Sequence, residues 1–228
     1  GTLPECFNEK GKFDASASGA YVGVIGSEVA DVKDIKGLLE AYSGLQTPGS
    51  NPRTWVPLVL VCSNMTGNAK SSFLAAQIPH GNGYVKAPFV LVGLPKGADY
   101  EQIRDVAAVV GSAMFDRTLG VDPAKQVEAT DLGFVPKAIV TARSSMFVPV
   151  PDNKEMETRI ADLEEMLGSA TGEDKERLSE RLSRLRGKYG VIKVPVTTES
   201  EFGYVKEMVE DGYRAVQSAM EHGVVPGG

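Results

Sequence analysis

The chain has 228 residues, of which 42% are hydrophobic and 24% are charged, so it is long enough to enclose the core of one or two domains. Its net charge of −6 argues against a nucleic-acid binder that depends on phosphate contacts, because the overall field has the wrong sign. Two cysteines cannot build a disulfide framework, and no apolar run reaches the length of about 20 residues that a membrane helix needs. We therefore expect a cytoplasmic protein that binds neither membranes nor nucleic acid.

Short apolar runs alternate with stretches of helical periodicity over the first two thirds of the sequence. Strands are predicted at residues 21–25, 58–62, 87–92, 138–140 and 146–150. Helices are predicted at residues 30–42, 67–77 and 99–110, and an exposed loop at residues 45–53. The uninterrupted apolar run at 58–62 is typical of a parallel sheet that is covered on both faces. Together these elements predict a layered α/β fold.

The composition becomes strongly charged between residues 152 and 188. Within this segment, leucines and other apolar residues recur at spacings of three and four, on both sides of a glycine-containing break at 168–172. This pattern predicts a hairpin of two helices that pack on each other and partly on the body, with their charges on solvated faces. Thr171 is a candidate N-cap of the second helix. A strand at 190–194 and a long helix at 199–222, capped by Gly223, are predicted to follow.

Few residues in the sequence carry recognisable catalytic chemistry. Gly67 and Lys70 follow a strand and open a helix, but the glycine spacing of a phosphate-binding loop is missing. His80 and His222 are the only histidines, and no His, Cys or Asp pair has the spacing of metal ligands, so we expect no metal site. By pattern alone, Asp211 is a surface carboxylate on the last helix.

Four stretches nevertheless resemble the apical-to-intermediate junction of GroEL-type (group I) chaperonins: residues 190–194, 198–199, 209–211 and 219–228. The likeness extends in order, with more divergence, through the rest of the chain. It implies a layered apical domain with a charged helical hairpin at residues 1–195, and part of an intermediate domain, with a long helix, at 196–228. The equatorial ATP-binding domain of the family is absent from this chain. Because the chain begins at Gly1 and ends at two glycines, we interpret it as a piece of a longer protein.

The resemblance also implies a function. The parent protein would be an ATP-dependent chaperonin that binds unfolded or misfolded polypeptides and assists their folding. It would use ATP and Mg²⁺, assemble as a homo-oligomeric ring and pair with a GroES-like co-chaperonin, whereas this chain alone would bind no cofactor and would not hydrolyse ATP. Asp211 matches the family carboxylate that prepares water for attack on ATP, a role that suits a group able to orient water. Gly227 and Gly228 match glycines that contact the nucleotide, which a missing side chain permits.

The family's polypeptide-binding groove uses two helices and an extended segment that present apolar side chains. The matching positions in this sequence are Thr2, Cys6, Phe7, Lys36, Leu39, Lys70, Leu74 and Ala75. Lys36 and Lys70 stand where the family has apolar residues, and Thr2 and Cys6 stand where it has aromatic ones. The implied groove is therefore smaller and partly cationic, unless a shifted register brings the neighbouring Ile35 and Phe73 to the surface. Such divergence favours a specialised chaperonin, for instance a viral one.

Two other functions stay open from the sequence. The first is a stand-alone α/β enzyme that acts on a small phosphorylated substrate near Gly67 and Lys70. The second is an interaction module that uses the charged hairpin as an arm. Either would lack the ATP-linked folding function of a chaperonin.

Overall fold

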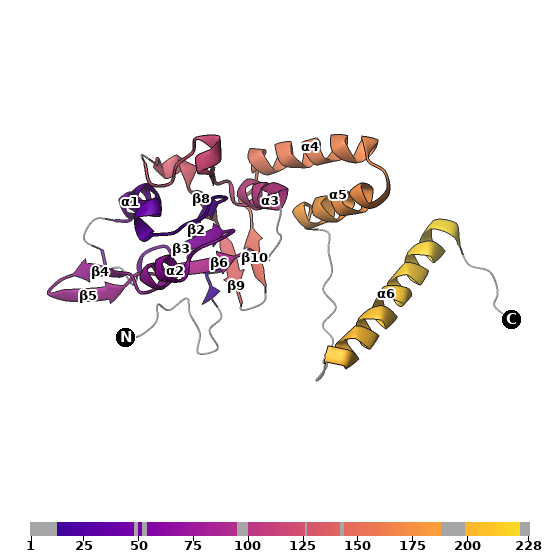
Figure 1. Ribbon diagram of the computed structural model, residues 1–228, viewed down its shortest axis with the longest axis horizontal. Helices are drawn as coiled ribbons and strands as arrows, with labels where there is room; N and C mark the ends of the chain where they lie inside the picture. Colours follow the sequence, from indigo (N-terminus) through magenta and orange to yellow (C-terminus); the bar gives the residue numbers. More distant parts are fainter. Residues whose placement is uncertain are drawn as a thin grey trace. The chain divides into compact units, whose positions relative to one another are not determined.

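The computed structural model describes residues 13–47, 50–51, 54–94, 100–125, 127–141, 144–187 and 199–223. The chain divides into two compact units, residues 1–188 and residues 189–228. The first unit has the predicted layered α/β architecture, in which helices cover the sheets (Figure 1). The predicted domain boundary after residue 195 lies outside the described residues and stays a prediction.

A five-stranded sheet forms the centre of the first unit. Its parallel strands, in spatial order, are β6 (Phe89–Gly93), β3 (Leu58–Cys62), β2 (Ala20–Ile25) and β7 (Met114–Phe115). A fifth strand, β8 (Gly133–Val135), pairs antiparallel with β2. Every residue of β3 is buried, as the uninterrupted apolar run predicts for a strand inside a covered parallel sheet. The three predicted strands of this sheet are confirmed.

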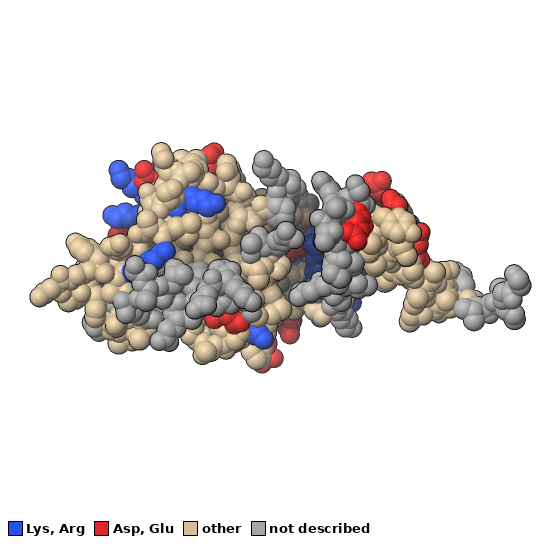
Figure 2. Space-filling model, turned by 90° about the horizontal axis from the view of Figure 1, so that it is seen from below, with Lys and Arg blue, Asp and Glu red and all other residues tan. Residues whose placement is uncertain are grey.

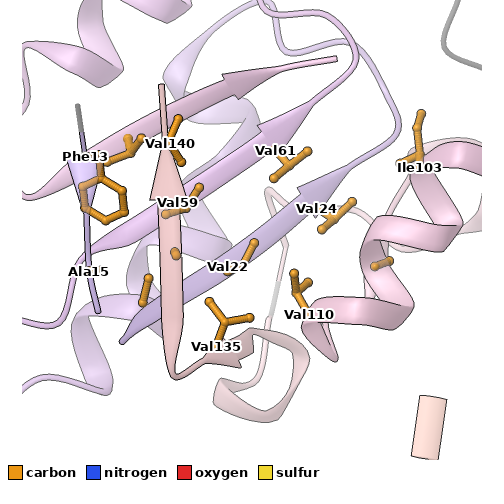
Figure 3. Close-up of a cluster of buried hydrophobic side chains, with 14 residues drawn as sticks. Phe13, Ala15, Val22, Val24, Val59, Val61, Ile103, Val110, Val135 and Val140 are labelled. Atoms are coloured by element: carbon orange, nitrogen blue, oxygen red, sulfur yellow. The ribbon is translucent and has the colours of Figure 1, made fainter. Parts of the chain in front are cut away.

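One face of the central sheet packs against α3 (Tyr100–Val110) and a small antiparallel sheet. The strands of that small sheet, in order, are β1 (Phe13–Asp14), β9 (Lys137–Val140) and β10 (Ser145–Val148). Alternate valines of β2 and β3 point into this layer, and Phe13, Ile103 and Val110 meet them from the other side (Figure 3). Alternate side chains of the strands and one face of α3 are apolar, and together they form a single apolar layer. The predicted helix at 99–110 is confirmed.

The opposite face of the sheet is covered by η1 (Val32–Ile35), α1 (Lys36–Gly44) and α2 (Gly67–Leu74). The predicted helix at 30–42 is corrected, because its first turn is a 3₁₀ turn and the α-helix begins at Lys36. The cause is a capping box in which Asp31 and Asp34 accept hydrogen bonds from backbone N–H groups. The N–H group of Leu38 also donates to the Pro123 carbonyl at 3.0 Å instead of to the helix.

The predicted helix at 67–77 is also corrected, since α2 ends at Leu74 and the chain then enters a two-stranded hairpin. The hairpin consists of β4 (Gln77–His80) and β5 (Gly83–Lys86), which pair with each other. Gly81, with φ +58°, occupies the first central position of the two-residue turn, where a type II′ hairpin turn favours glycine. Two short 3₁₀ turns, η3 (Arg117–Leu119) and η4 (Ala129–Asp131), complete the first unit.

The predicted helical hairpin is confirmed as α4 (Lys154–Ser169) and α5 (Gly172–Leu185). Its apolar seam consists of four buried leucines, Leu163, Leu178, Leu182 and Leu185. Asn153 caps α4, because its Oδ1 accepts from the Met156 N–H group, and its Nδ2 donates to two carbonyls at the end of α3. Thr171 holds the N-cap position of α5, although its side chain makes no capping hydrogen bond.

The second unit contains the long helix α6 (Glu199–His222), which matches the predicted range. Gly223 ends it with φ +81°, and its N–H group donates to the Ala219 carbonyl at 2.9 Å, as predicted for a left-handed C-cap. The predicted strand at 190–194 lies outside the described residues. Within the part of the chain that the structure describes, no helix is long and apolar enough to cross a membrane.

Candidate functional site

The outer surface of α1 and α2 carries five of the residues that the sequence assigns to polypeptide binding. On the side of η1 and α1 that faces the sheet, Ile35, Leu38 and Tyr42 are fully buried. The helical period therefore turns Lys36 to solvent, where its Nζ lies 3.5 Å from the Glu40 carboxylate. Both side chains are about two thirds exposed, so this pair contributes little to stability.

Helix α2 is fixed beside the beginning of η1. The Thr66 N–H group donates to the Val29 carbonyl at 3.0 Å, and the Thr66 hydroxyl donates to the Ala30 carbonyl at 2.9 Å. Phe73 is buried and stacks on Phe89 of the central sheet, with ring centroids 4.8 Å apart. These contacts leave Lys70 exposed one turn into the helix.

The five predicted residues on these helices differ in exposure. Leu39 and Leu74 are half-buried and pack against the core below, whereas Lys36, Lys70 and Ala75 are exposed. Lys36 and Leu39 lie on α1, Lys70 and Leu74 lie on α2, and Ala75 is the C-cap residue of α2. The surface is therefore a small apolar strip bordered by two cations.

The residues next to the two lysines settle which side chains reach this surface. Ile35 and Phe73 have relative exposures of 0% and 1%, so both belong to the core. The alternative register, in which they would face the groove, does not occur. Thr2, Cys6 and Phe7 lie outside the described residues.

Asp211 lies in the middle of α6, in the second unit, and is exposed. One residue before it, Glu210 lies 3.5 Å from Lys206 in an exposed ion pair. Among the described residues no ion pair holds Asp211 itself, so its carboxylate is accessible. Gly227 and Gly228 lie outside the described residues.

A buried ionic cluster, which the sequence did not suggest, joins the charged hairpin to α3. Asp105 of α3 accepts hydrogen bonds from Arg159 of α4 and Arg181 of α5, and Glu101 accepts another from Arg159. Side-chain exposures of 6% for Arg159 and 8% for Arg181 correct the prediction that the charges of the hairpin are solvated. Their long stems lie between the helices, where Asp105 compensates their charges.

The cluster shifts the pKa values of an acid and a base in opposite directions. Burial by itself raises the pKa of Glu101, but the hydrogen bond from Arg159 and the charges of Arg159 and Arg104 outweigh it, so the pKa lies below its ordinary value. Burial lowers the pKa of Arg159, yet the two carboxylates raise it overall. Both shifts favour the charged forms of Glu101 and Arg159, and their ion pair helps to hold the hairpin on α3.

The described residues give little support to a small-molecule active site near Gly67 and Lys70. The Thr66 hydroxyl donates to the Ala30 carbonyl, and Lys70 is exposed to solvent. Among the described residues Cys62 is the one thiol, and burial raises its pKa to about 11 although the charge of Lys70 lowers it. Within the described ranges, no three His, Cys, Asp or Glu side chains gather as metal ligands would.

A comparison with models of known protein families finds no match. Among curated proteins, the chain is similar to the chaperonin GroEL of Orientia tsutsugamushi, with 29% identity over 215 residues. The similarity covers 91% of this chain and 36% of the relative, and the same values hold for strains Boryong and Ikeda. The chain thus spans little more than a third of the length of these curated relatives.

Among solved structures, the chain is similar to the chaperonin gp146 of the bacteriophage EL 2 (Pseudomonas aeruginosa), crystallised in the presence of ATP-BeFx. The TM-score is 0.58 at 19% sequence identity, and the match covers 96% of this chain and 40% of that one. At this identity the likeness concerns the fold. The predicted α/β fold of chaperonin type is therefore confirmed.

Proposed function

Because this chain is a divergent relative of the GroEL-type chaperonins, we propose that its first unit is the part of an ATP-dependent chaperonin that binds non-native polypeptides. The observation that carries the proposal is the surface of α1 and α2. Two helices, separated in sequence by a strand, cover the same face of one sheet, and they leave Lys36, Lys70 and Ala75 exposed and Leu39 and Leu74 partly exposed. In this proposal residues 1–195 form the apical domain.

The strip on this surface fits weak binding without sequence specificity. Leu39, Leu74 and Ala75 offer apolar surface that is only partly covered, and unfolded chains expose apolar side chains that would otherwise meet water. The strip is small and bordered by Lys36 and Lys70, so each contact is weak. Repeating the unit in a homo-oligomeric ring would raise the overall affinity by multivalency.

Binding of a denatured protein to the chain tests this role directly. A neutral test protein, diluted from urea, should bind the chain, whereas its native form should not. Ala75→Glu places a charge in the strip and should weaken binding, while Ala161→Glu makes the same change on the exposed side of α4 and should not. Failure of the wild-type chain to bind denatured protein would overturn the proposal.

The second unit is proposed to serve the nucleotide step. Residues 196–228 would form part of an intermediate domain, in which Asp211 orients a water molecule for attack on ATP and Gly227 and Gly228 approach the nucleotide. The accessible carboxylate of Asp211 fits this role, because it is not committed to an ion pair in the described part of the chain. ATP with Mg²⁺ would supply the phosphoryl group and its charge neutralisation when bound. We expect no ATP hydrolysis by the 228 residues alone.

The remaining parts of the proposal concern the whole protein. The whole protein would act on unfolded or misfolded polypeptides, form a ring of identical subunits, bind a GroES-like co-chaperonin and lie in the cytoplasm. The similarity to chaperonins over 91% of the chain supports them.

A further inference from the structure

Among the described strands, none covers the outer edges of the hairpin β4–β5. Its two strands pair only with each other within the described part of the chain, and they project from the body beyond α2 (Figure 1). The hairpin starts shortly after α2 ends, and at its base the Ala87 N–H group donates to the Ala76 carbonyl at 3.0 Å. An exposed edge of this kind is a template for the addition of another strand.

The two edges of the hairpin are not equivalent. In this register the pairs His80–Gly83 and Ile78–Val85 exchange hydrogen bonds inside the hairpin, so the N–H and C=O groups of Tyr84 and Lys86 point outward from β5. The corresponding outward residues of β4 include Pro79, which has no N–H group to donate. The edge of β5 is therefore the better site for an incoming strand.

The side chains along β5 define what such a strand would meet. Tyr84 is 72% exposed and Lys86 is exposed on the same face of the strand, while Val85 alternates to the other face and is half-buried. Lys86 has no ion pair within the described residues. The tip of the hairpin is drawn without acidic or basic atoms at the left of Figure 2.

The charge pattern of the sequence selects the partner. Between Glu40 and Asp99 the chain contains no aspartate or glutamate, although it has 30 acidic residues in total. This stretch includes α2 and the whole hairpin, and its charged residues are all basic. In a protein with a net charge of −6, α2 and the hairpin therefore carry no carboxylate of their own that would repel an acidic segment.

We propose that the edge of β5, with Tyr84 and Lys86, binds extended acidic segments of non-native polypeptides. The segment adds as a strand to β5, its backbone forms hydrogen bonds with Tyr84 and Lys86, and one of its carboxylates lies near the Lys86 ammonium group. This inference rests on the proposed function, since it names the class of client that the first unit prefers.

The test uses the 228-residue chain and fluorescent strand-forming peptides with Glu, or in a second version Gln, at alternate positions. The Glu peptide should bind more tightly, and its affinity should fall as salt is raised. Lys86→Glu should weaken it about fivefold, the effect expected of exposed charges, while the same reversal at Lys175 on α5 should leave it unchanged. Tyr84→Pro removes one outward N–H group without touching a bond to β4 and should weaken both peptides about fivefold.

A parallel measurement with the neutral denatured protein separates this inference from the proposed function. Equal affinity for the Glu and Gln peptides, or insensitivity to Lys86→Glu, would overturn the acidic preference even where the denatured protein binds. If neither the peptides nor the denatured protein bind, both proposals fail. Equally tight binding of a single-stranded oligonucleotide, or self-association of the chain that Tyr84→Pro abolishes, would also overturn it, because the occupant would then be a nucleic acid or a second copy.

Discussion

The carboxylate of Asp105 and the guanidinium of Arg181 face each other in a bidentate pair, with Nε–Oδ2 and Nη2–Oδ1 distances of 2.6 and 2.8 Å. The same carboxylate accepts the Nε–H group of Arg159 at 2.8 Å. One acid on α3 therefore fixes both helices of the hairpin, 54 and 76 residues further along the chain. The hairpin is attached to the body by charge as well as by its leucine seam.

Asp105→Asn should destabilise the first unit strongly, because it leaves two buried arginines with only the more exposed Glu101 to compensate their charges. The expected loss is about 3–5 kcal/mol in the free energy of unfolding, measured by urea titration. Asp162→Asn, on the exposed side of α4, is the matched control and should change stability by less than about 0.5 kcal/mol. A loss below about 1 kcal/mol for Asp105→Asn would show that the cluster is not needed for stability.

Glu101 should make the stability of the folded chain depend on pH in the acidic range. Its pKa is lower in the folded chain than in the unfolded chain, so the ionised form stabilises the fold at neutral pH, and this contribution is lost as pH falls through the folded pKa. Between pH 5 and about 3 the wild-type chain should thus lose more stability than Glu101→Gln. Asp34, whose pKa is lowered chiefly by Arg117, contributes equally to both proteins and cancels in the comparison. Parallel urea midpoints over this range would contradict the role of Glu101.

Gly37 should not tolerate even a methyl group. A Cβ atom at this position would lie 1.6 Å from the Lys125 carbonyl oxygen, so α1 or the loop at 123–125 would have to move. Gly37→Ala should therefore cost about 1–3 kcal/mol, although alanine normally favours a helix. Gly168→Ala in α4, where a Cβ atom meets open space, should be neutral or slightly stabilising. Thermal unfolding of the two variants gives the comparison, and equal melting temperatures would rule out the close approach.

The sequence correctly predicts those elements whose type, strand or helix, is set by a single local pattern. β2, β3 and α3 are uninterrupted or strictly periodic, so the period alone sets their type. The ends of α2 and α1 depend on other signals. The glycines on either side of Asn82 mark a hairpin turn that stops α2 from extending, and the capping box of Asp31 and Asp34 tightens the turn before α1.

The sequence predicts which positions form the candidate surface, but it leaves open whether the lysines or their apolar neighbours reach solvent. The resemblance placed Lys36 and Lys70 on two helices, and burial of Ile35 and Phe73 decides that the lysines reach solvent. The ionic cluster has no local signal, because Asp105 and its arginine partners lie far apart in the chain. Charged residues with helical spacing look the same whether they face water or a buried acid on another helix.

Cys62 should be almost inert in the folded chain, because burial raises its pKa to about 11. In a Cys6→Ser background, alkylation at pH 8 should be at least about a hundredfold slower than in urea, since so little thiolate is present. The rate should keep rising up to about pH 11 as the thiolate forms. A rate that levels off near pH 9 would mean that the thiol is solvated and that the layer over β3 is loosely packed.

Asp211 should be needed for ATP hydrolysis but not for ATP binding in the longer protein that we propose contains this chain. A carboxylate that orients the attacking water acts on the chemical step, so Asp211→Ala should slow turnover by about a hundredfold or more. The Kd of ATP should stay within about twofold, because binding energy comes from other groups. Glu207→Ala, on the same exposed helix, is the control and should hydrolyse ATP at nearly the wild-type rate. Turnover by Asp211→Ala at the wild-type rate would remove Asp211 from the nucleotide step, whereas equal losses in both variants would indicate a general effect on α6.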